Sequence, residues 1–159
     1  MKIWKRNTDI NKINKNMENT MTSHLGIIIT EISKDTLEGT MPVTSNIMQP
    51  YGIVHGGASV TLAETLGSLA SNLCIDQETN TVGLEINANH VRAVKAGIIK
   101  GITKPIHLGR STHVWEVKLY NNEHTTCISR LTMAILSSIK ILPSPWYSSH
   151  LIWINCLIL

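Results

Sequence analysis

The longest stretch of the chain that keeps a helical hydrophobic period lies between residues 57 and 74. Between His55 and Asp76 the only charged side chain is Glu64, and apolar side chains recur around it every three or four residues. This spacing predicts a helix that is buried over most of its surface. An ionisable group in such a helix has a cost in free energy that packing alone does not require. Glu64 is therefore the first candidate for chemistry.

Polar side chains form one stripe along this predicted helix. Thr61, Glu64 and Ser68 are three or four residues apart, so they share a face. The helix begins at the glycine pair after His55, where free backbone N–H groups and the helix dipole can stabilise an oxyanion. Two plainer interpretations stay open. The glycines can serve close helix packing, and Glu64 can pair with a lysine or arginine elsewhere in the chain.

Extended segments lie on both sides of this helix in the sequence. Residues 25–32 and 36–43 predict a hairpin, and a loop over residues 44–54 leads to the helix. Four further extended segments follow the helix, over residues 81–91, 96–106, 111–120 and 125–136. The pattern predicts an α+β fold in which one long central helix is wrapped by an antiparallel β-sheet.

The first strand after the helix shows a regular alternation. The apolar side chains predicted to face the core are Val82, Leu84, Ile86 and Ala88. His90 has the same parity as these four. It is therefore predicted to point toward the helix that carries Glu64.

The two ends of the chain differ from the part between them. Residues 1–20 are rich in Asn and Lys and are interpreted as a polar N-terminal arm, with order beginning near Met21. Residues 21–136 form the predicted domain. Residues 137–159 form an atypical apolar tail in which Pro143 and Pro145 exclude a long helix. We interpret this tail as a foreign extension, a product of a reading-frame slip, or a docking segment for a neighbouring subunit.

Composition excludes several classes of function. The net charge of +3 arises in the first fifteen residues, since the remainder has slightly more acidic than basic groups, and a nucleic-acid-binding surface is not expected. Three separated cysteines argue against a disulfide framework and fit a reducing, cytoplasmic location. No apolar run reaches the ~20 residues of a membrane span. The histidines that have no companions suggesting metal ligation are His24, His113, His124 and His150.

The run NIMQPYGIVHGGASVTLAETLGSLAS resembles the signature of hotdog-fold acyl-CoA thioesterases of the PaaI-like branch. GLEINANHVRA and PIHLGR extend the resemblance over roughly residues 2 to 136. The chain is similar in particular to enzymes that hydrolyse 1,4-dihydroxy-2-naphthoyl-CoA in menaquinone synthesis. Related members remove misloaded aryl groups from a carrier protein or hydrolyse 4-hydroxybenzoyl-CoA. The resemblance implies the hotdog fold, an aromatic acyl-CoA substrate, no cofactor besides the CoA of that substrate, and a homotetramer built as a dimer of dimers.

The resemblance also implies catalytic roles. Glu64 attacks the thioester carbonyl or activates water, and the sequence does not choose between these roles. The backbone N–H of Gly56 and the side-chain amide of Gln49 polarise the carbonyl, and His55 aids departure of the thiolate. From the residues alone, Gln49 can equally be a solvated loop amide and His55 a helix cap.

Further residues are implied to orient water and to hold the CoA moiety. Ser68 and His90 orient the hydrolytic water, although a helical serine can instead bond back to a carbonyl one turn earlier. The residues implied to bind substrate or CoA are Gln49, Gly83, His90, Val91, Arg92, Ala93, His107, Leu108, Gly109, Arg110, Ser111 and Thr112. The familiar HHRP motif of the family is HVRA at residues 90–93, which puts the binding of CoA in doubt.

Two other classes of function compete with hydrolysis. A hotdog hydratase or dehydratase acting on a carrier-bound acyl chain would keep the fold, but HGG followed by AETLGS argues against it. A non-catalytic acyl-CoA-binding protein is the second alternative, and the HVRA change and the unusual tail would be its signs. Release of thiol from aryl-CoA esters separates these classes.

Overall fold

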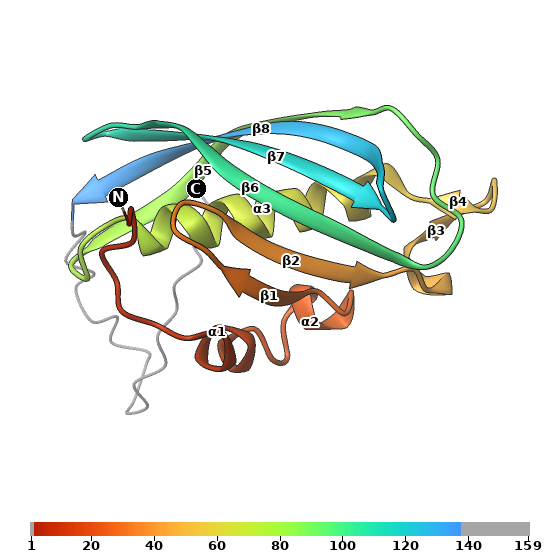
Figure 1. The fold of residues 1–159 in the computed structure, drawn as a ribbon, viewed down its shortest axis with the longest axis horizontal. Coiled ribbons are helices and arrows are strands. Elements are labelled where there is room, and N and C mark those ends of the chain that lie inside the picture. The colour runs from red at the N-terminus through yellow and green to blue at the C-terminus, as the bar shows by residue number, and fades with distance from the viewer. Residues whose placement is uncertain (1, 138–159) are drawn as a thin grey trace, which may run out of the picture.

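The computed structural model describes residues 2 to 137, in which one long helix lies against a six-stranded antiparallel sheet (Figure 1). The helices are α1 (Ile10–Asn16), α2 (Met21–His24) and α3 (Gly56–Leu73), with a 3₁₀ turn η1 (Ser45–Ile47). The strands are β1 (Ile28–Ile32), β2 (Leu37–Pro42), β3 (Met48–Gln49), β4 (Ile53–Val54), β5 (Thr79–His90), β6 (Ile98–Leu108), β7 (Thr112–Asn121) and β8 (His124–Ser137). The sheet has the order β1-β2-β6-β7-β8-β5, and β3 pairs with β4 separately. The predicted arrangement of helix and sheet is confirmed.

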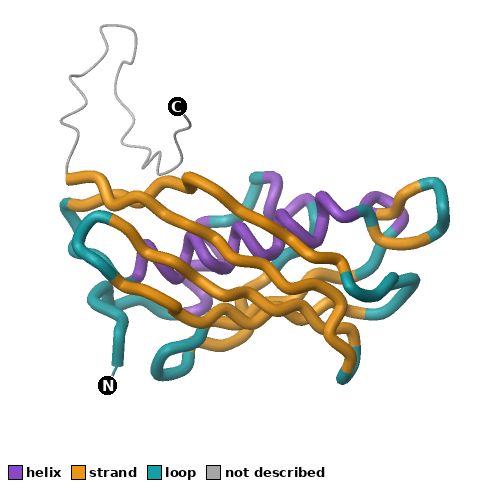
Figure 2. Tube along the Cα trace, turned by 90° about the horizontal axis from the view of Figure 1, so that it is seen from above, coloured by secondary structure: helices purple, strands orange, loops and turns teal. Residues whose placement is uncertain are grey.

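The apolar face of α3 forms the centre of the core, and the sheet curves around it (Figure 2). Leu62 and Leu66 are fully buried. Two glycines allow helix and sheet to approach closely. A Cβ at Gly67 would clash with a methyl carbon of Leu131, and one at Gly101 would clash with a methyl carbon of Leu66. Small residues on both elements therefore set how near α3 lies to the strands.

The two edges of the sheet differ. The outer edge of β1 is covered by the N-terminal segment: the Asn14 amide donates to Ile29 O at 2.9 Å and accepts from Ile29 N at 2.8 Å. The Trp4 indole N–H donates to Ser33 O at 2.7 Å. At the other edge, β5 pairs only with β8 over residues 80–90, within the part of the chain that the structure describes. β5 is therefore the edge left open for another strand.

The expectation of a polar arm before Met21 is wrong. Trp4, Ile13 and Met17 are buried members of the core, and the Trp4 ring stacks on Trp115 with centroids 6.4 Å apart. The reason is the spacing of the few apolar residues in a lysine-rich and asparagine-rich segment. Ile13 and Met17 are four residues apart, so α1 turns both toward β1 while its charged residues face solvent.

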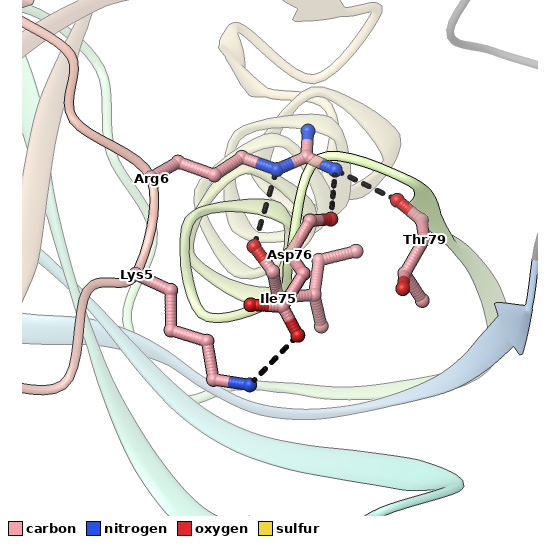
Figure 3. Close-up of polar contacts among 5 residues, drawn as sticks. All are labelled: Lys5, Arg6, Ile75, Asp76 and Thr79. Atoms are coloured by element: carbon pink, nitrogen blue, oxygen red, sulfur yellow. Dashed lines mark hydrogen bonds and ion pairs between the residues drawn. The ribbon is translucent and has the colours of Figure 1, made fainter.

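Residues 5 and 6 attach this segment to the C-terminal end of α3 (Figure 3). The Arg6 guanidinium donates to the carbonyl oxygens of Ile75 at 3.3 Å, Asp76 at 2.9 Å and Thr79 at 2.7 Å. Lys5 pairs with the Asp76 carboxylate at 3.2 Å. Cations near a helix C-terminus interact favourably with its dipole. The end of α3 is thus fixed relative to the first residue of β5.

If the N-terminal segment belongs to the core, Trp4→Ala should destabilise the protein strongly. The expected loss in free energy of unfolding is about 3 kcal/mol, because a buried indole and its stacking on Trp115 disappear together. Chemical denaturation followed by circular dichroism measures this loss. The exposed neighbour Lys2→Ala is the control and should change stability little. Equal stability of the two variants would mean that the N-terminal segment is a polar arm that does not contribute to the core.

The alternation predicted for β5 is correct from Ile86 onward and wrong before it. Pairing with β8 passes from Gly83–Met133 directly to Glu85–Thr132, so Leu84 is the extra residue of a bulge and is 58% exposed. The bulge reverses the parity, so that Gly83 lies on the core side and Val82 does not. His90 keeps the predicted parity and faces the start of α3.

The apolar tail predicted for residues 137–159 lies outside the described residues, apart from Ser137 at the end of β8.

Candidate active site

The carboxyl group of Glu64 lies in the middle of α3 and is half-buried. Ser68, one turn later, donates from Oγ to Glu64 Oε1 at 3.4 Å. On the sheet side the neighbour is Gly83 of β5, where a Cβ would lie 2.6 Å from Oε1. Burial raises the pKa of Glu64, and the Ser68 hydroxyl lowers it in part. The site therefore holds a carboxyl group that is less acidic than a solvated one.

Among residues 2–137, Glu64 has no positively charged partner. The ion pairs found among residues 2–137 join Lys5 to Asp76, Lys100 to Glu38 and Lys118 to Glu116. The simple ion-pair interpretation of Glu64 is therefore set aside for the described part of the chain. A half-buried carboxylate without a counter-ion can serve as a general base or a nucleophile.

Ser68 contacts both Glu64 and the neighbouring strand β8. Besides its bond to Glu64, its Oγ lies 3.7 Å from the Sδ of Met133 on β8. Met133 is a member of this environment that the sequence did not single out, because its contact depends on the register between β5 and β8. The predicted partner of Ser68, His90, lies elsewhere, beside Gly56, where a Cβ on the glycine would meet His90 Nε2 at 2.9 Å.

Of the two glycine amides at the start of α3, one is free within residues 2–137. His55 is the N-cap, and its Nδ1 accepts from the Gly57 N–H at 2.9 Å. The Gly57 N–H is therefore occupied, contrary to the expectation that both glycine amides are free. The Gly56 N–H has no acceptor within residues 2–137. His55 acts as the cap with Nδ1, which leaves Nε2 for another role.

The predicted carbonyl-polarising groups lie well away from Glu64 of the same chain. Gly56 precedes Glu64 by eight residues, which is about 12 Å along a helix. Gln49 is held in the β3–β4 hairpin, which reaches the helix start through the bond from His55 N to Ile47 O at 2.8 Å. Its side chain is half-buried and has no hydrogen-bond partner in the described chain. One chain therefore carries two separated halves of the predicted site.

The residues predicted to hold CoA are also divided. Val91 and Arg92, which precede Ala93, donate from their backbone N–H groups to Thr126 O at one end of β5. The end of β6, the β6–β7 turn and the start of β7 hold His107, Leu108, Gly109, Arg110, Ser111 and Thr112, and the turn is closed by a hydrogen bond from Gly109 N to Thr112 O at 2.9 Å. Thr112 is in register with Ala134, and Ala134 with Val82. The turn is thus near the opposite end of β5, about 25 Å of strand away from His90.

His113 is buried, not solvated. Its Nδ1 shares a hydrogen bond of 2.7 Å with Ser71 Oγ, and its ring meets Trp115 edge to face. The signal in the sequence was parity, since His113 alternates with solvent-facing residues in the same phase as Trp115 and Val117. No cluster of three potential metal ligands occurs within residues 2–137, and no helix in that part is long and apolar enough to span a membrane.

Known proteins match this chain along most of its length. The thioesterase superfamily model matches residues 51–128, which include α3 and its helix start. The 1,4-dihydroxy-2-naphthoyl-CoA hydrolase of Escherichia coli is 48% identical over 135 residues, 84% of this chain and 99% of the relative. The proofreading thioesterase EntH of Cronobacter sakazakii is 46% identical over 135 residues, 84% of this chain and 98% of the relative.

The chain belongs to the thioesterase superfamily. A thioesterase from Haemophilus influenzae has the same fold, with a TM-score of 0.85 and 42% identity over 87% of this chain and 98% of that one. The hotdog fold expected from the sequence is confirmed, and the chain is a thioester hydrolase.

Proposed function

We propose that this thioesterase hydrolyses an aromatic acyl-CoA, specifically 1,4-dihydroxy-2-naphthoyl-CoA, with Glu64 as nucleophile or general base. The observation that carries the proposal is the half-buried Glu64 carboxyl, which has no counter-ion among residues 2–137 and faces the backbone of β5 at Gly83. The naphthoyl group is supported by the name of the 48% identical relative. The reaction would take place in the cytoplasm and need no cofactor besides the CoA of the substrate.

A second candidate is the proofreading release of aryl groups from a carrier protein. It is supported by the name of a relative that is nearly as similar, at 46% identity. A panel of kcat/KM values for naphthoyl-CoA, benzoyl-CoA, a fatty acyl-CoA and an aryl carrier protein tests both candidates. We expect the highest value for naphthoyl-CoA. A clear preference for the loaded carrier would favour proofreading, and no thiol release from any thioester would exclude both.

The two separated halves of the site suggest a second copy of the chain. β5 is the open edge, and the exposed apolar side chains there are Leu84 in the strand and Val91 directly after it. Two-fold pairing of two β5 strands is antiparallel, so the Gly83 region of one copy would lie near the His90 end of the other. The partner's Gly56 and Gln49 would then approach Glu64 of the first copy and supply the polarising groups.

The same pairing would also complete a binding site for the CoA moiety. The β6–β7 turn with Arg110 lies by the Gly83 end of β5, and Arg92 follows the His90 end. Antiparallel pairing would bring Arg110 of one copy toward Arg92 of the other, so two guanidinium groups could meet the phosphates of one CoA. We expect HVRA to weaken pantetheine or phosphate binding relative to HHRP without abolishing turnover.

Mixing two inactive variants tests whether each site is shared between subunits. Glu64→Gln and Gln49→Ala should each be nearly inactive, whereas subunits mixed in equal amounts, unfolded and refolded together should regain about one quarter of the parent activity. Half of the dimers would then be mixed, and each mixed dimer would contain one intact site. Refolding each variant alone is the control. Mixed material with no regained activity would place Gln49 and Glu64 in the same subunit's site.

A further inference from the structure

A buried polar pair joins α3 to the sheet away from the substrate. Ser71, near the end of α3, and His113 of β7 share a hydrogen bond of 2.7 Å between Oγ and Nδ1. Ser71 is fully buried and His113 is 3% exposed. Neither side chain can therefore reach a thioester. Their bond must be explained by what it does inside the protein.

This bond has no counterpart elsewhere along the helix. Within residues 2–137, it is the single hydrogen bond between nitrogen or oxygen atoms that joins an α3 side chain to the sheet. Apolar side chains of α3 such as Leu62 and Leu66 also pack against the strands. Apolar contacts are not directional, so they only weakly oppose rotation or sliding of a helix. A buried hydrogen bond has a preferred distance and angle, so it opposes both motions.

The bond lies on the same row of the sheet as the catalytic carboxyl. Pairing places Gly83, Met133 and His113 opposite one another on β5, β8 and β7. Each faces one polar side chain of α3, with Glu64 at Gly83, Ser68 at Met133 and Ser71 at His113. The three helix residues are spaced by four and three positions, so a rotation that moved Ser71 would move Glu64 as well.

The imidazole of His113 is suited to a permanent structural bond. Burial lowers its pKa, and the nearby His107 and Lys5 lower it further. The ring is therefore neutral near pH 7 and can share a proton with the Ser71 hydroxyl without carrying a buried charge.

We propose that Ser71 and His113 are positioning residues that fix α3 over this row and so hold Glu64 and Ser68 at the thioester. This inference rests on the proposed catalytic role of Glu64. It assigns a role in turnover to a pair that does not touch the substrate. The pair is expected to act on kcat more than on KM, because it orients the attacking group and not the CoA contacts.

The test compares kcat and KM of Ser71→Ala and His113→Phe, far below their melting temperatures and per folded molecule. Each should lower kcat roughly 10-fold with KM nearly unchanged, since small displacements of a reacting group have large effects on rate. His113→Asn, whose amide can still bond to Ser71, should keep kcat within about threefold of the parent. Thr103→Val is the matched control, because it removes another buried hydroxyl bond, to Glu116 O at 3.2 Å, without involving α3.

Equal kcat values for Ser71→Ala and Thr103→Val would overturn the inference and leave the pair with a role in stability only. A loss in His113→Asn as large as that in His113→Phe would overturn it as well. Measuring Glu64→Gln in parallel distinguishes a failure of the proposed function from a failure of the positioning role. Full turnover in Glu64→Gln would refute the proposed function itself, whereas an inactive Glu64→Gln beside a fully active Ser71→Ala would refute only the positioning role.

Discussion

Glu64→Gln should lower kcat for an aryl-CoA by at least about 10²-fold while KM changes little. The amide has nearly the same shape as the carboxylate, so the fold and the CoA contacts are preserved, but it can neither accept a proton nor form an acyl anhydride. Thiol release followed with a thiol reagent measures the effect. Glu123→Gln, in the exposed turn between β7 and β8, is the matched control and should keep parent activity. Near-parent turnover in Glu64→Gln would remove Glu64 from the mechanism.

The same substitution should raise thermal stability at neutral pH. Burial raises the pKa of Glu64 on folding. The charged form is therefore less favourable in the folded state, and stability is lost as the pH rises from the ordinary glutamate pKa through the folded one. Replacing the carboxylate by a neutral amide removes this penalty at pH 7, and the difference should vanish below about pH 4.

Melting temperatures of the parent and of Glu64→Gln across this pH range distinguish a catalytic carboxyl from a structural one. If Glu64 were the partner of a buried cation, the amide would leave that cation uncompensated and destabilise the protein at pH 7. A gain in stability together with a loss of turnover is the signature of a site kept for function at some expense of stability.

Gly83→Ala should lower kcat by about 10² with a small change in stability. The added Cβ would lie 2.6 Å from Glu64 Oε1, so the carboxyl group would have to move away from β5. The atom displaced is the end of a flexible side chain, and for this reason the fold should tolerate the change. Glu123→Ala, in the exposed turn between β7 and β8, is the control.

Comparing the change in kcat with the change in KM in Gly83→Ala shows whether this glycine makes room for Glu64 or binds CoA. A fall in kcat at constant KM fits displacement of Glu64. A rise in KM at constant kcat would mean that Gly83 serves only to bind CoA, and would contradict the close contact with the carboxyl as the reason for a glycine here.

Periodicity was sufficient to predict α3 and the four strands that follow it, because their apolar residues repeat regularly over ten or more positions. It failed where regularity is interrupted. The bulge at Leu84 reverses the parity of β5 for the residues before it, and nothing in the alternation marks an extra residue. It also failed before Met21, where Trp4, Ile13 and Met17 are separated by polar residues and the short α1 gives little periodic signal.

The site was predictable only in part for similar reasons. Glu64 stood out because it is a lone charge in an apolar helix. The hydrogen bond between Ser71 and His113 could not be found from the sequence, because it joins two elements whose relative position depends on packing. The separation of Gly56 from Glu64 follows from helix geometry, but the way in which both could serve one thioester depends on a second copy of the chain.

Glu64 is a half-buried carboxyl without a counter-ion among residues 2–137, and its proton affinity is the most direct measure of that state. Carbon-13 NMR of protein labelled at the glutamate side-chain carboxyl, with the Glu64 signal identified by its absence from Glu64→Gln, gives the pKa of this group alone. We expect a midpoint clearly above that of the exposed glutamates of the same chain. A midpoint equal to theirs, or below it, would mean that the carboxyl is solvated or paired, and would contradict the account.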